Sequence, residues 1–316
     1  MPLVWIDHED FLLHDTRPGH PERPDRLRAI RTALDQSGLA SRMTKLRPTP
    51  LEMSELSALH SRAYLDRCRR VCEEDAPTTM DSEDVVVCRE SFDLALLAAG
   101  AAVHGADAIA EGKFRRAFST QRPPGHHAER DHAMGFCLFN NIALAANRVT
   151  TQHRLDRVAI VDFDVHHGNG TQHLFEQRSD VLFISIHQDP RTCYPGTGHA
   201  DELGKGEGED FTLNVPMPPG SDDDDYRRAF ETSILPKLDA YRPRMLFISA
   251  GFDAMAEDPL AQIELTSGAY DWMTRRLVEI AQQHCGGRIL SVLEGGYDLH
   301  ALGRAAAAHA AALAED

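Results

Sequence analysis

The sequence predicts a single α/β domain with a mainly parallel sheet and helices on both of its faces. Apolar, β-branched segments of strand length alternate with longer Ala- and Leu-rich segments of helix length along the 316 residues. This alternation implies right-handed crossovers between parallel strands, as in doubly wound folds. No repeat or low-complexity linker divides the chain, so residues 1–316 are interpreted as one domain.

Several of the predicted elements have recognisable ends. Gly38 is expected to cap the first helix, and Ser91 and Ser221 are expected to be N-caps of later helices. The acidic segment 73–89 is interpreted as an irregular surface loop. Strands are predicted at 3–6, 115–120, 157–163, 181–187, 211–215, 244–250 and 288–293, and helices up to Gln36, within 50–72, from Ser91 to about Gly112, at 138–150, shortly after 163, from Ser221, at 264–284 and near the C-terminal end.

Composition and charge argue against several classes of protein. Lys and Arg number 33 against 49 Asp and Glu, a net charge of −16, whereas a nucleic-acid-binding protein needs a basic surface. No apolar run approaches the roughly 18 residues of a membrane span, and the N-terminal segment lacks the pattern of a secretory signal. The six cysteines form no Cys-x-x-Cys pair, which predicts free thiols in a reducing cytoplasm.

The segment 159–170 combines an apolar strand with a dense group of ionisable residues. Asp162, Asp164, His166 and His167 follow the strand directly. Side chains alternate along a strand, so the first three of these share one face. A single Asp–His pair would be an ordinary structural feature. Four ionisable groups at the end of a buried strand instead require pairing or a metal ion.

Four other predicted strands also end in polar motifs. In a parallel α/β sheet the functional site lies beyond the carboxyl ends of the strands, so these motifs are expected to meet at one edge. The five strand ends are followed or formed by Gln121-Arg-Pro-Pro-Gly-His-His-Ala128, by the Asp162–His167 group, by Ser185-Ile-His187, by Ala250-Gly-Phe-Asp253 and by Leu293-Glu-Gly-Gly-Tyr-Asp298.

The residue types at these strand ends indicate catalysis at a metal. Asp164, His166 and Asp253 would supply three protein ligands, and three ligands with an open water position are typical of catalytic zinc. The tandem His126–His127 on a Pro-Pro-Gly loop is suited to proton transfer, although an exposed polar turn is the alternative. Tyr297 is either a packing tyrosine or a phenol that binds a developing oxyanion.

Five motifs occur together in a characteristic order: Arg122-Pro-Pro-Gly-His-His127, Gly135-Phe-Cys-Leu-Phe-Asn140, Asp162-Phe-Asp-Val-His-His-Gly-Asn-Gly170, Ala250-Gly-Phe-Asp253 and Glu294-Gly-Gly-Tyr297. Together they resemble the zinc-dependent histone deacetylase family, and more closely its class II and bacterial histone-deacetylase-like amidohydrolases. The resemblance extends from about His20 to the last helix. It implies an arginase-like α/β fold, one Zn²⁺ per chain and hydrolysis of an acylated amine to a free amine and a carboxylate.

The resemblance also implies a role for each motif residue. Asn169 lies at the position behind His127 where class I members carry Asp. An amide keeps the hydrogen bond but not the charge, so His127 is expected to be less basic than in class I. The other implied roles are zinc ligand for Asp164, His166 and Asp253, general base and acid for His127, electrostatic partner for His126 oriented by Asp162, and oxyanion donor for Tyr297.

A narrow substrate tunnel is implied as well. Tyr194 stands where Phe is usual in the family, and its hydroxyl would suit a more polar acyl chain or linker. Vertebrate polyamine deacetylases carry Glu at the gate position occupied here by Leu260, which favours an uncharged linker such as acyl-lysine. The implied substrate-binding residues are Gly135, Phe136, Tyr194, Leu260, Asp84 at the rim, Gly295 and Gly296.

Two potassium sites belong to the same resemblance. From the residues alone, Asp162 and Ser185 could equally form a hydrogen-bonded pair without an ion. The first site would use Asp162, Asp164, His166, Ser185 and Ile186, and the second would lie around Phe175, Arg178, Val181 and Phe211.

The preferred prediction is removal of an acetyl or other acyl group from acyl-lysine in proteins or peptides. A small N-acyl amine such as an acetylpolyamine is the alternative substrate, and the charge of −16 favours a cationic ligand of that kind. A non-catalytic acyl-lysine binding protein would be expected to lack part of the catalytic set, and a binuclear arginase-like hydrolase would need further metal ligands. No partner nucleic acid or membrane is expected, and the oligomeric state is left open.

Overall fold

One parallel sheet forms the centre of the fold. Within residues 2–74 and 77–315, which the computed structural model describes, the sheet has eight strands in the order β2-β1-β5-β10-β9-β6-β7-β8. Every neighbouring pair in it is parallel. The strands are β1 (Val4–Ile6), β2 (Thr44–Leu46), β5 (Arg116–Ser119), β6 (Val158–Asp162), β7 (Val181–Gln188), β8 (Thr212–Met217), β9 (Met245–Ala250) and β10 (Ile289–Leu293). The predicted fold class is confirmed.

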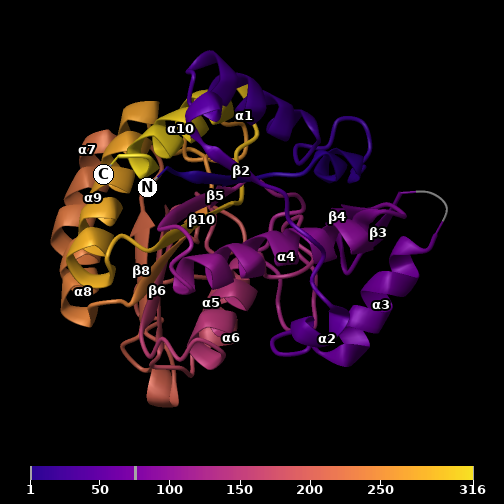
Figure 1. Cartoon of the computed structure of the whole chain (residues 1–316), viewed down its shortest axis with the longest axis horizontal. Coiled ribbons are helices and arrows are strands. Elements are labelled where there is room, and N and C mark those ends of the chain that lie inside the picture. The colour runs from indigo at the N-terminus through magenta and orange to yellow at the C-terminus, as the bar shows by residue number, and fades with distance from the viewer. Residues whose placement is uncertain (1, 75–76, 316) are drawn as a thin grey trace.

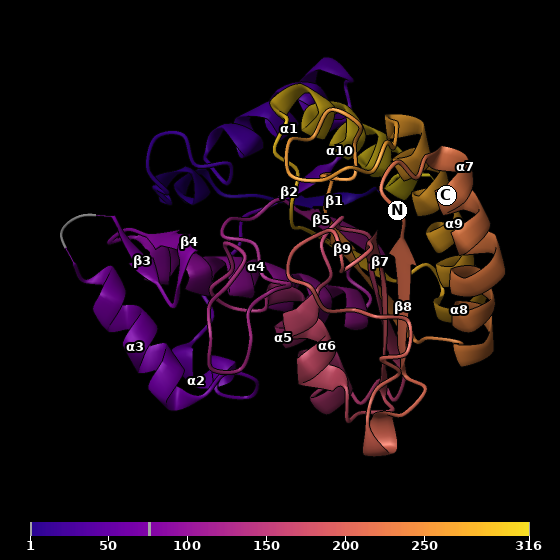
Figure 2. The same cartoon turned by 180° about the vertical axis from the view of Figure 1, so that it is seen from behind.

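Helices cover the sheet on both sides. Figures 1 and 2 show α7, α8 and α9 on one side and α4, α5 and α6 on the other, with α1 packed along α10. The helices are α1 (Asp25–Gln36), α2 (Met53–Leu56), α3 (Arg62–Cys72), α4 (Ser91–Ala110), α5 (Asn141–Thr151), α6 (Asn169–Phe175), α7 (Asp223–Ala229), α8 (Leu235–Tyr241), α9 (Ser267–Cys285) and α10 (Leu299–Leu313). Shorter turns are the 3-10 helices Glu9–Leu13, Ala40–Arg42 and Gly206–Gly208 and the π-helix Phe230–Ile234.

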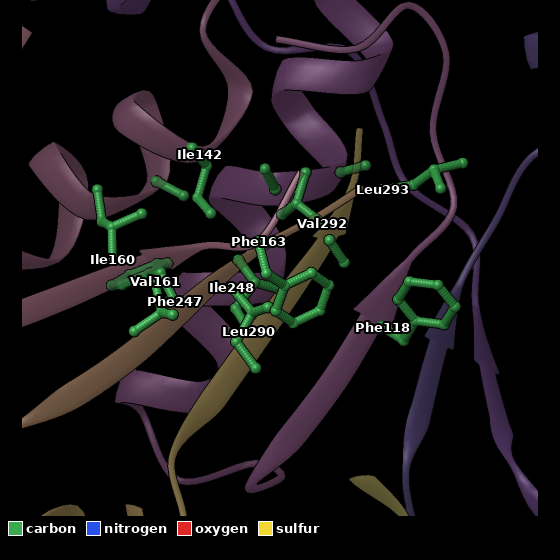
Figure 3. Close-up of a cluster of buried hydrophobic side chains, with 14 of the residues drawn as sticks. Phe118, Ile142, Ile160, Val161, Phe163, Phe247, Ile248, Leu290, Val292 and Leu293 are labelled. Carbon is green, nitrogen blue, oxygen red and sulfur yellow. The ribbon is translucent and has the colours of Figure 1, made fainter. Parts of the chain in front are cut away.

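The central strands are buried on both faces, which explains their nearly continuous apolar sequences. Every residue of β6, β7, β9 and β10 is buried. Figure 3 shows side chains from these strands, among them Ile160, Phe247 and Leu290, packed in one cluster with Phe163 and Ile142. The charged residues at the ends of β6 and β9 therefore emerge from an apolar layer that fixes their positions.

Helix α4 contradicts the expectation that no segment is long and apolar enough to span a membrane. It has 20 residues with a mean hydropathy of 1.4, so its length and composition would allow it to cross a membrane. In the structure 72% of the apolar window lies inside the protein, where α4 packs against α5 and the sheet. The helix is apolar over most of its surface because most of that surface is buried.

Three other local predictions were wrong. Within the acidic segment 73–89, β3 (Thr78–Met80) and β4 (Ser82–Val87) form an antiparallel hairpin, and residues 75–76 lie outside the described part. Ser91 is the first residue of α4 rather than its cap, and Asp222 rather than Ser221 caps α7. The edge strand β2 was not predicted, because two of its three residues are exposed and the sequence therefore lacks the apolar pattern of a buried strand. All six cysteines are free, as expected.

Candidate active site

A pocket of about 240 Å³ opens at the carboxyl ends of the central strands. Its walls bring together residues from seven separate segments of the sequence, all of which lie in the sequence motifs or were implied by the family resemblance. The lining residues are Asp84, His127, Gly135, Phe136, His166, Tyr194, Leu260 and Tyr297.

Asp164, His166 and Asp253 form a compact cluster at this pocket. Their potential ligand atoms all lie within 4.8 Å of one another, and all three residues are buried. His166 Nδ1 lies 3.1 Å from Asp164 Oδ1 and 3.2 Å from Asp253 Oδ2. The remaining carboxylate oxygens are fixed by backbone donors, because Val165 N donates to Asp253 Oδ1 at 2.9 Å and Gly295 N donates to Asp164 Oδ2 at 2.7 Å.

This cluster fits a divalent metal ion. Two buried carboxylates carry more negative charge than one imidazole can neutralise, so a bound cation would stabilise them. Two oxygens and one nitrogen are a ligand set that catalytic zinc uses, with the open position facing solvent or substrate. His166 lines the pocket, so that position would face the substrate. A Cβ at Gly295 would overlap the Asp253 and Asp164 carboxylates, so only glycine allows the backbone to approach them. The residues described in the structure contain no other cluster of this kind.

His126 and His127 are buried, which excludes the exposed polar turn. Their rings lie 4.0 Å apart, and His126 Nδ1 lies 3.0 Å from Asp162 Oδ2. Burial alone would lower the pKa of His126, but the negative charges of Asp164 and Asp162 outweigh it and raise the pKa to about 10. Burial and the positive charges of His126 and His166 lower the pKa of His127 well below its usual value. The pair therefore consists of one imidazolium and one neutral imidazole at neutral pH.

The partner of His127 is Asn169, the first residue of α6. His127 Nδ1 lies 2.7 Å from Asn169 Oδ1, which is the contact that the resemblance implied. The amide oxygen can only accept a hydrogen bond, so Nδ1 must carry the proton. The other ring nitrogen, Nε2, is then free to accept a proton at the pocket.

Tyr297 lies in a loop whose position is fixed by contacts with other buried residues. Its ring packs edge-on against Phe136 with centroids 5.7 Å apart, and the Arg26 guanidinium lies 5.0 Å from the ring centroid. Arg26 Nε also donates to the carbonyl of Gly296 at 2.7 Å. Burial raises the pKa of the Tyr297 phenol well above its usual value, as does the charge of Asp253. Tyr297 therefore remains a hydrogen-bond donor.

The pocket walls are aromatic and apolar. Tyr194 stands perpendicular to His127 with ring centroids 5.1 Å apart and is 43% exposed at the mouth. Gly135 has φ of +56° and Phe136 has φ of +67°, and a side chain at Gly135 would overlap the His127 ring. Asp84 accepts a hydrogen bond from Gly135 N at 2.9 Å, so this rim carboxylate also supports the wall.

Other implied residues lie outside the pocket lining. Gly295 and Gly296 contact the metal-ligand carboxylates and Arg26 respectively, and their role in substrate binding stays a prediction. Among the described hydrogen bonds, Ser185 Oγ pairs with His187 Nδ1 at 2.8 Å, whereas Asp162 binds His126 and Asp164 N. The residues implied for potassium lie at the end of β6 and just after it (Asp162, Asp164, His166), within β7 (Val181, Ser185, Ile186), at the end of α6 (Phe175) and in the segments that precede β7 and β8 (Arg178, Phe211). Potassium itself stays a prediction.

Sequence patterns did not reveal a set of buried charges behind the site. The Glu22 carboxylate binds both Arg26 and Arg122. Arg26 also donates to the carbonyl of Gly296 in the site loop, and Arg122 donates to the carbonyl of Phe11 in the N-terminal segment. Asp258 Oδ2 accepts from Tyr297 N at 2.7 Å, and its Oδ1 accepts from Leu260 N at 3.1 Å. Two of these residues, Glu22 and Arg122, occur in segments rich in Pro and Gly, which was the available signal in the sequence.

Comparison with known proteins gives one consistent result. A model of the histone deacetylase domain matches residues 20–313. A histone deacetylase-like amidohydrolase of Pseudomonas aeruginosa is 41% identical over 280 residues, covering 88% of this chain and 73% of the relative. A probable deacetylase of Archaeoglobus fulgidus is 38% identical over 296 residues, covering 93% and 81%. The crystal structure of the HDA15 HD domain matches with a TM-score of 0.93 and 39% identity, covering 99% of this chain and 89% of that one.

Proposed function

This chain belongs to the histone deacetylase family, and we propose that it is a zinc-dependent amidohydrolase that removes acetyl or other acyl groups from lysine side chains. The observation that carries this proposal is the buried Asp164–His166–Asp253 cluster beside a neutral imidazole, His127, and a phenol, Tyr297. His127, His166 and Tyr297 line one pocket with aromatic and apolar walls, as hydrolysis of an amide on an alkyl chain requires. Potassium, implied by the resemblance alone, is proposed as a structural ion without a catalytic step.

The ligand set would hold one Zn²⁺ through the carboxylates of Asp164 and Asp253 and through Nδ1 of His166. When bound, the ion supplies polarisation of the scissile carbonyl and a lowered pKa for water. His127 would take a proton at Nε2 and return it to the leaving amine, since its lowered pKa keeps it neutral. Tyr297 would donate to the oxygen of the reacting carbonyl.

His126 would act through its charge. Its raised pKa keeps an imidazolium next to His127, and Asp162 holds that cation by a hydrogen bond. A fixed positive charge stabilises negative charge that develops on the substrate. Proton transfer is therefore assigned to His127 and electrostatic stabilisation to His126.

The walls of the pocket favour a substrate with an uncharged stem. Phe136 and Tyr194 line the pocket, and Leu260 is 38% exposed at its mouth. These surfaces suit the methylene chain of lysine. An acetylpolyamine is the second candidate, supported by Asp84 at the same mouth and by the net charge of −16, which would attract a cationic substrate.

The six free thiols support a reducing, cytoplasmic location.

A substrate panel tests this proposal. The zinc-loaded protein is assayed with an acetyl-lysine peptide, longer acyl-lysine peptides and N-acetylputrescine, with His127→Ala as the background control. We expect hydrolysis of the acetyl-lysine peptide that chelation abolishes and zinc restores. Absence of hydrolysis above the His127→Ala background for every substrate would overturn the assignment of function.

A further inference from the structure

We propose that Glu129 is a positioning residue for the catalytic base, acting on His127 through Asn169. Asn169 Nδ2 donates to Glu129 Oε1 at 2.6 Å, and Asn169 Oδ1 faces His127 Nδ1 at 2.7 Å. The three side chains thus form a continuous hydrogen-bonded chain that ends at the pocket. The inference rests on the proposed function in naming His127 as the base, but the geometry of the chain is independent of the reaction.

The surroundings of Asn169 allow only one orientation of its amide. Three acceptors surround Nδ2: Glu129 Oε1 at 2.6 Å, Met134 Sδ at 3.2 Å and the carbonyl of His127 at 3.4 Å. A flipped amide would place its oxygen against a carboxylate and a carbonyl, which repel it. Glu129 Oε1 is the nearest of the three acceptors, and a carboxylate oxygen accepts a stronger hydrogen bond than a carbonyl or a thioether.

Fixing the amide fixes the tautomer of His127. With Oδ1 directed at the ring, Nδ1 must carry the hydrogen, and Nε2 keeps its lone pair toward the pocket. If the amide flipped, its NH₂ group would face the ring, and the favoured tautomer would carry its proton on Nε2. That tautomer has no lone pair at the pocket and could not act as a base there. Glu129 therefore selects the reactive form of His127 without touching the substrate.

Glu129 is itself well anchored. His60 Nδ1 lies 2.9 Å from the Glu129 carbonyl, and Glu129 N donates to the carbonyl of His132 at 2.9 Å. Its Oε1 is shared with His173 Nδ1 at 2.7 Å, and the His173 side chain is 42% exposed. Glu129 and His173 line another pocket of about 340 Å³, separate from the one that His127 lines. The carboxylate thus has a second partner, which allows a matched control.

The test measures the tautomer directly. Nitrogen-15 NMR of histidine-labelled protein distinguishes Nδ1–H from Nε2–H, and His127→Ala identifies the His127 signals. We expect Nδ1–H in the wild type, a mixture of tautomers in Glu129→Ala, and retention of Nδ1–H in Glu129→Gln, whose carbonyl oxygen still accepts from Asn169. His173→Ala removes the other partner of Glu129 and is expected to leave the tautomer unchanged.

Kinetics provide the second readout. Glu129→Ala should lower kcat about tenfold or more, within the range for loss of a residue that orients a catalytic group, with little change in KM. In an Asn169→Ala background, Glu129→Ala should cause no further loss, because the residue through which it acts is gone. An unchanged tautomer and kcat in Glu129→Ala, or an equal loss in the Asn169→Ala background, would overturn the proposal. A tautomer shift in a protein that hydrolyses no acyl amine would support it while refuting the proposed function.

Discussion

Substitution of Leu260 by Glu should move substrate preference from acetyl-lysine peptides toward acetylated polyamines. Leu260 lies at the mouth of the pocket, and Asp258 holds its backbone N–H at 3.1 Å, so its side chain has a defined position. A polyamine carries ammonium groups beyond the scissile amide, and a carboxylate at position 260 would face them. An acetyl-lysine peptide has only a methylene stem at the same depth.

The expected change in substrate preference is limited by the solvent exposure of position 260. An ammonium about 6 Å from a carboxylate gains about 1.4 kcal/mol at an effective dielectric constant of about 40. Leu260 is 38% exposed, so solvent and salt reduce that gain. We therefore expect the ratio of kcat/KM for N-acetylputrescine to that for an acetyl-lysine peptide to rise roughly five- to tenfold.

The assay compares both substrates side by side at low and high salt. Leu260→Gln is the matched control, since it has the shape of Glu without its charge. The ratio should rise in Leu260→Glu, fall back as salt is added, and stay near the wild-type value in Leu260→Gln. An equal rise in both variants would show that size or polarity matters rather than charge. A wild type that already prefers the polyamine would make the second candidate substrate the correct one.

Three further predictions concern the machinery itself. Asp164→Ala and Asp253→Ala should each remove bound zinc in elemental analysis, because each deletes one of three protein ligands, and normal zinc content in both would refute the metal site. Asn169→Asp, combined with Glu129→Gln so that no second carboxylate faces the new one, places a negative charge beside His127 Nδ1 and favours the protonated form of His127. The acidic limb of the kcat/KM profile should then move upward by about one to two pH units, and an unmoved limb would contradict the contact between Asn169 and His127. Asp258→Ala removes the acceptor of Tyr297 N and should lower kcat about tenfold with zinc retained, whereas loss of zinc with activity would indicate a wider collapse of the site.

The sequence predicted most of the sheet because buried strands and their polar ends are local patterns. Periodicity and residue type were enough to predict the strand at 157–163 and to place the motif that follows it at the functional edge of the sheet. The hairpin within 73–89 was missed since β3 has only three residues, acidic residues lie near the start of β4, and both strands are separate from the main sheet. Its Asp84 nevertheless lines the pocket, where the family resemblance had placed it.

The supporting charges could not be predicted, since their partners are far apart in the chain. Arg26 reaches the carbonyl of Gly296 across 270 positions, and Arg122 reaches Glu22 across 100. No periodicity relates residues so far apart in the chain. The sequence around an Arg also does not show whether its side chain is buried or exposed. Only the folded chain shows that these two cations are fully buried and therefore belong to the framework of the site.

The tandem histidines illustrate how one short segment sets opposite protonation states. His126 and His127 are neighbours on the same loop and are equally buried, so burial alone would make both neutral. Their Nδ1 atoms face different residues of one segment, Asp162 for the first and Asn169 for the second. The negative charges of Asp164 and Asp162 together raise the pKa of His126, whereas burial and the charges of His126 and His166 lower the pKa of His127 despite its contact with Asn169. A carboxylate hydrogen-bonded to the first ring and a neutral amide hydrogen-bonded to the second therefore contribute to the opposite protonation states of the two imidazoles.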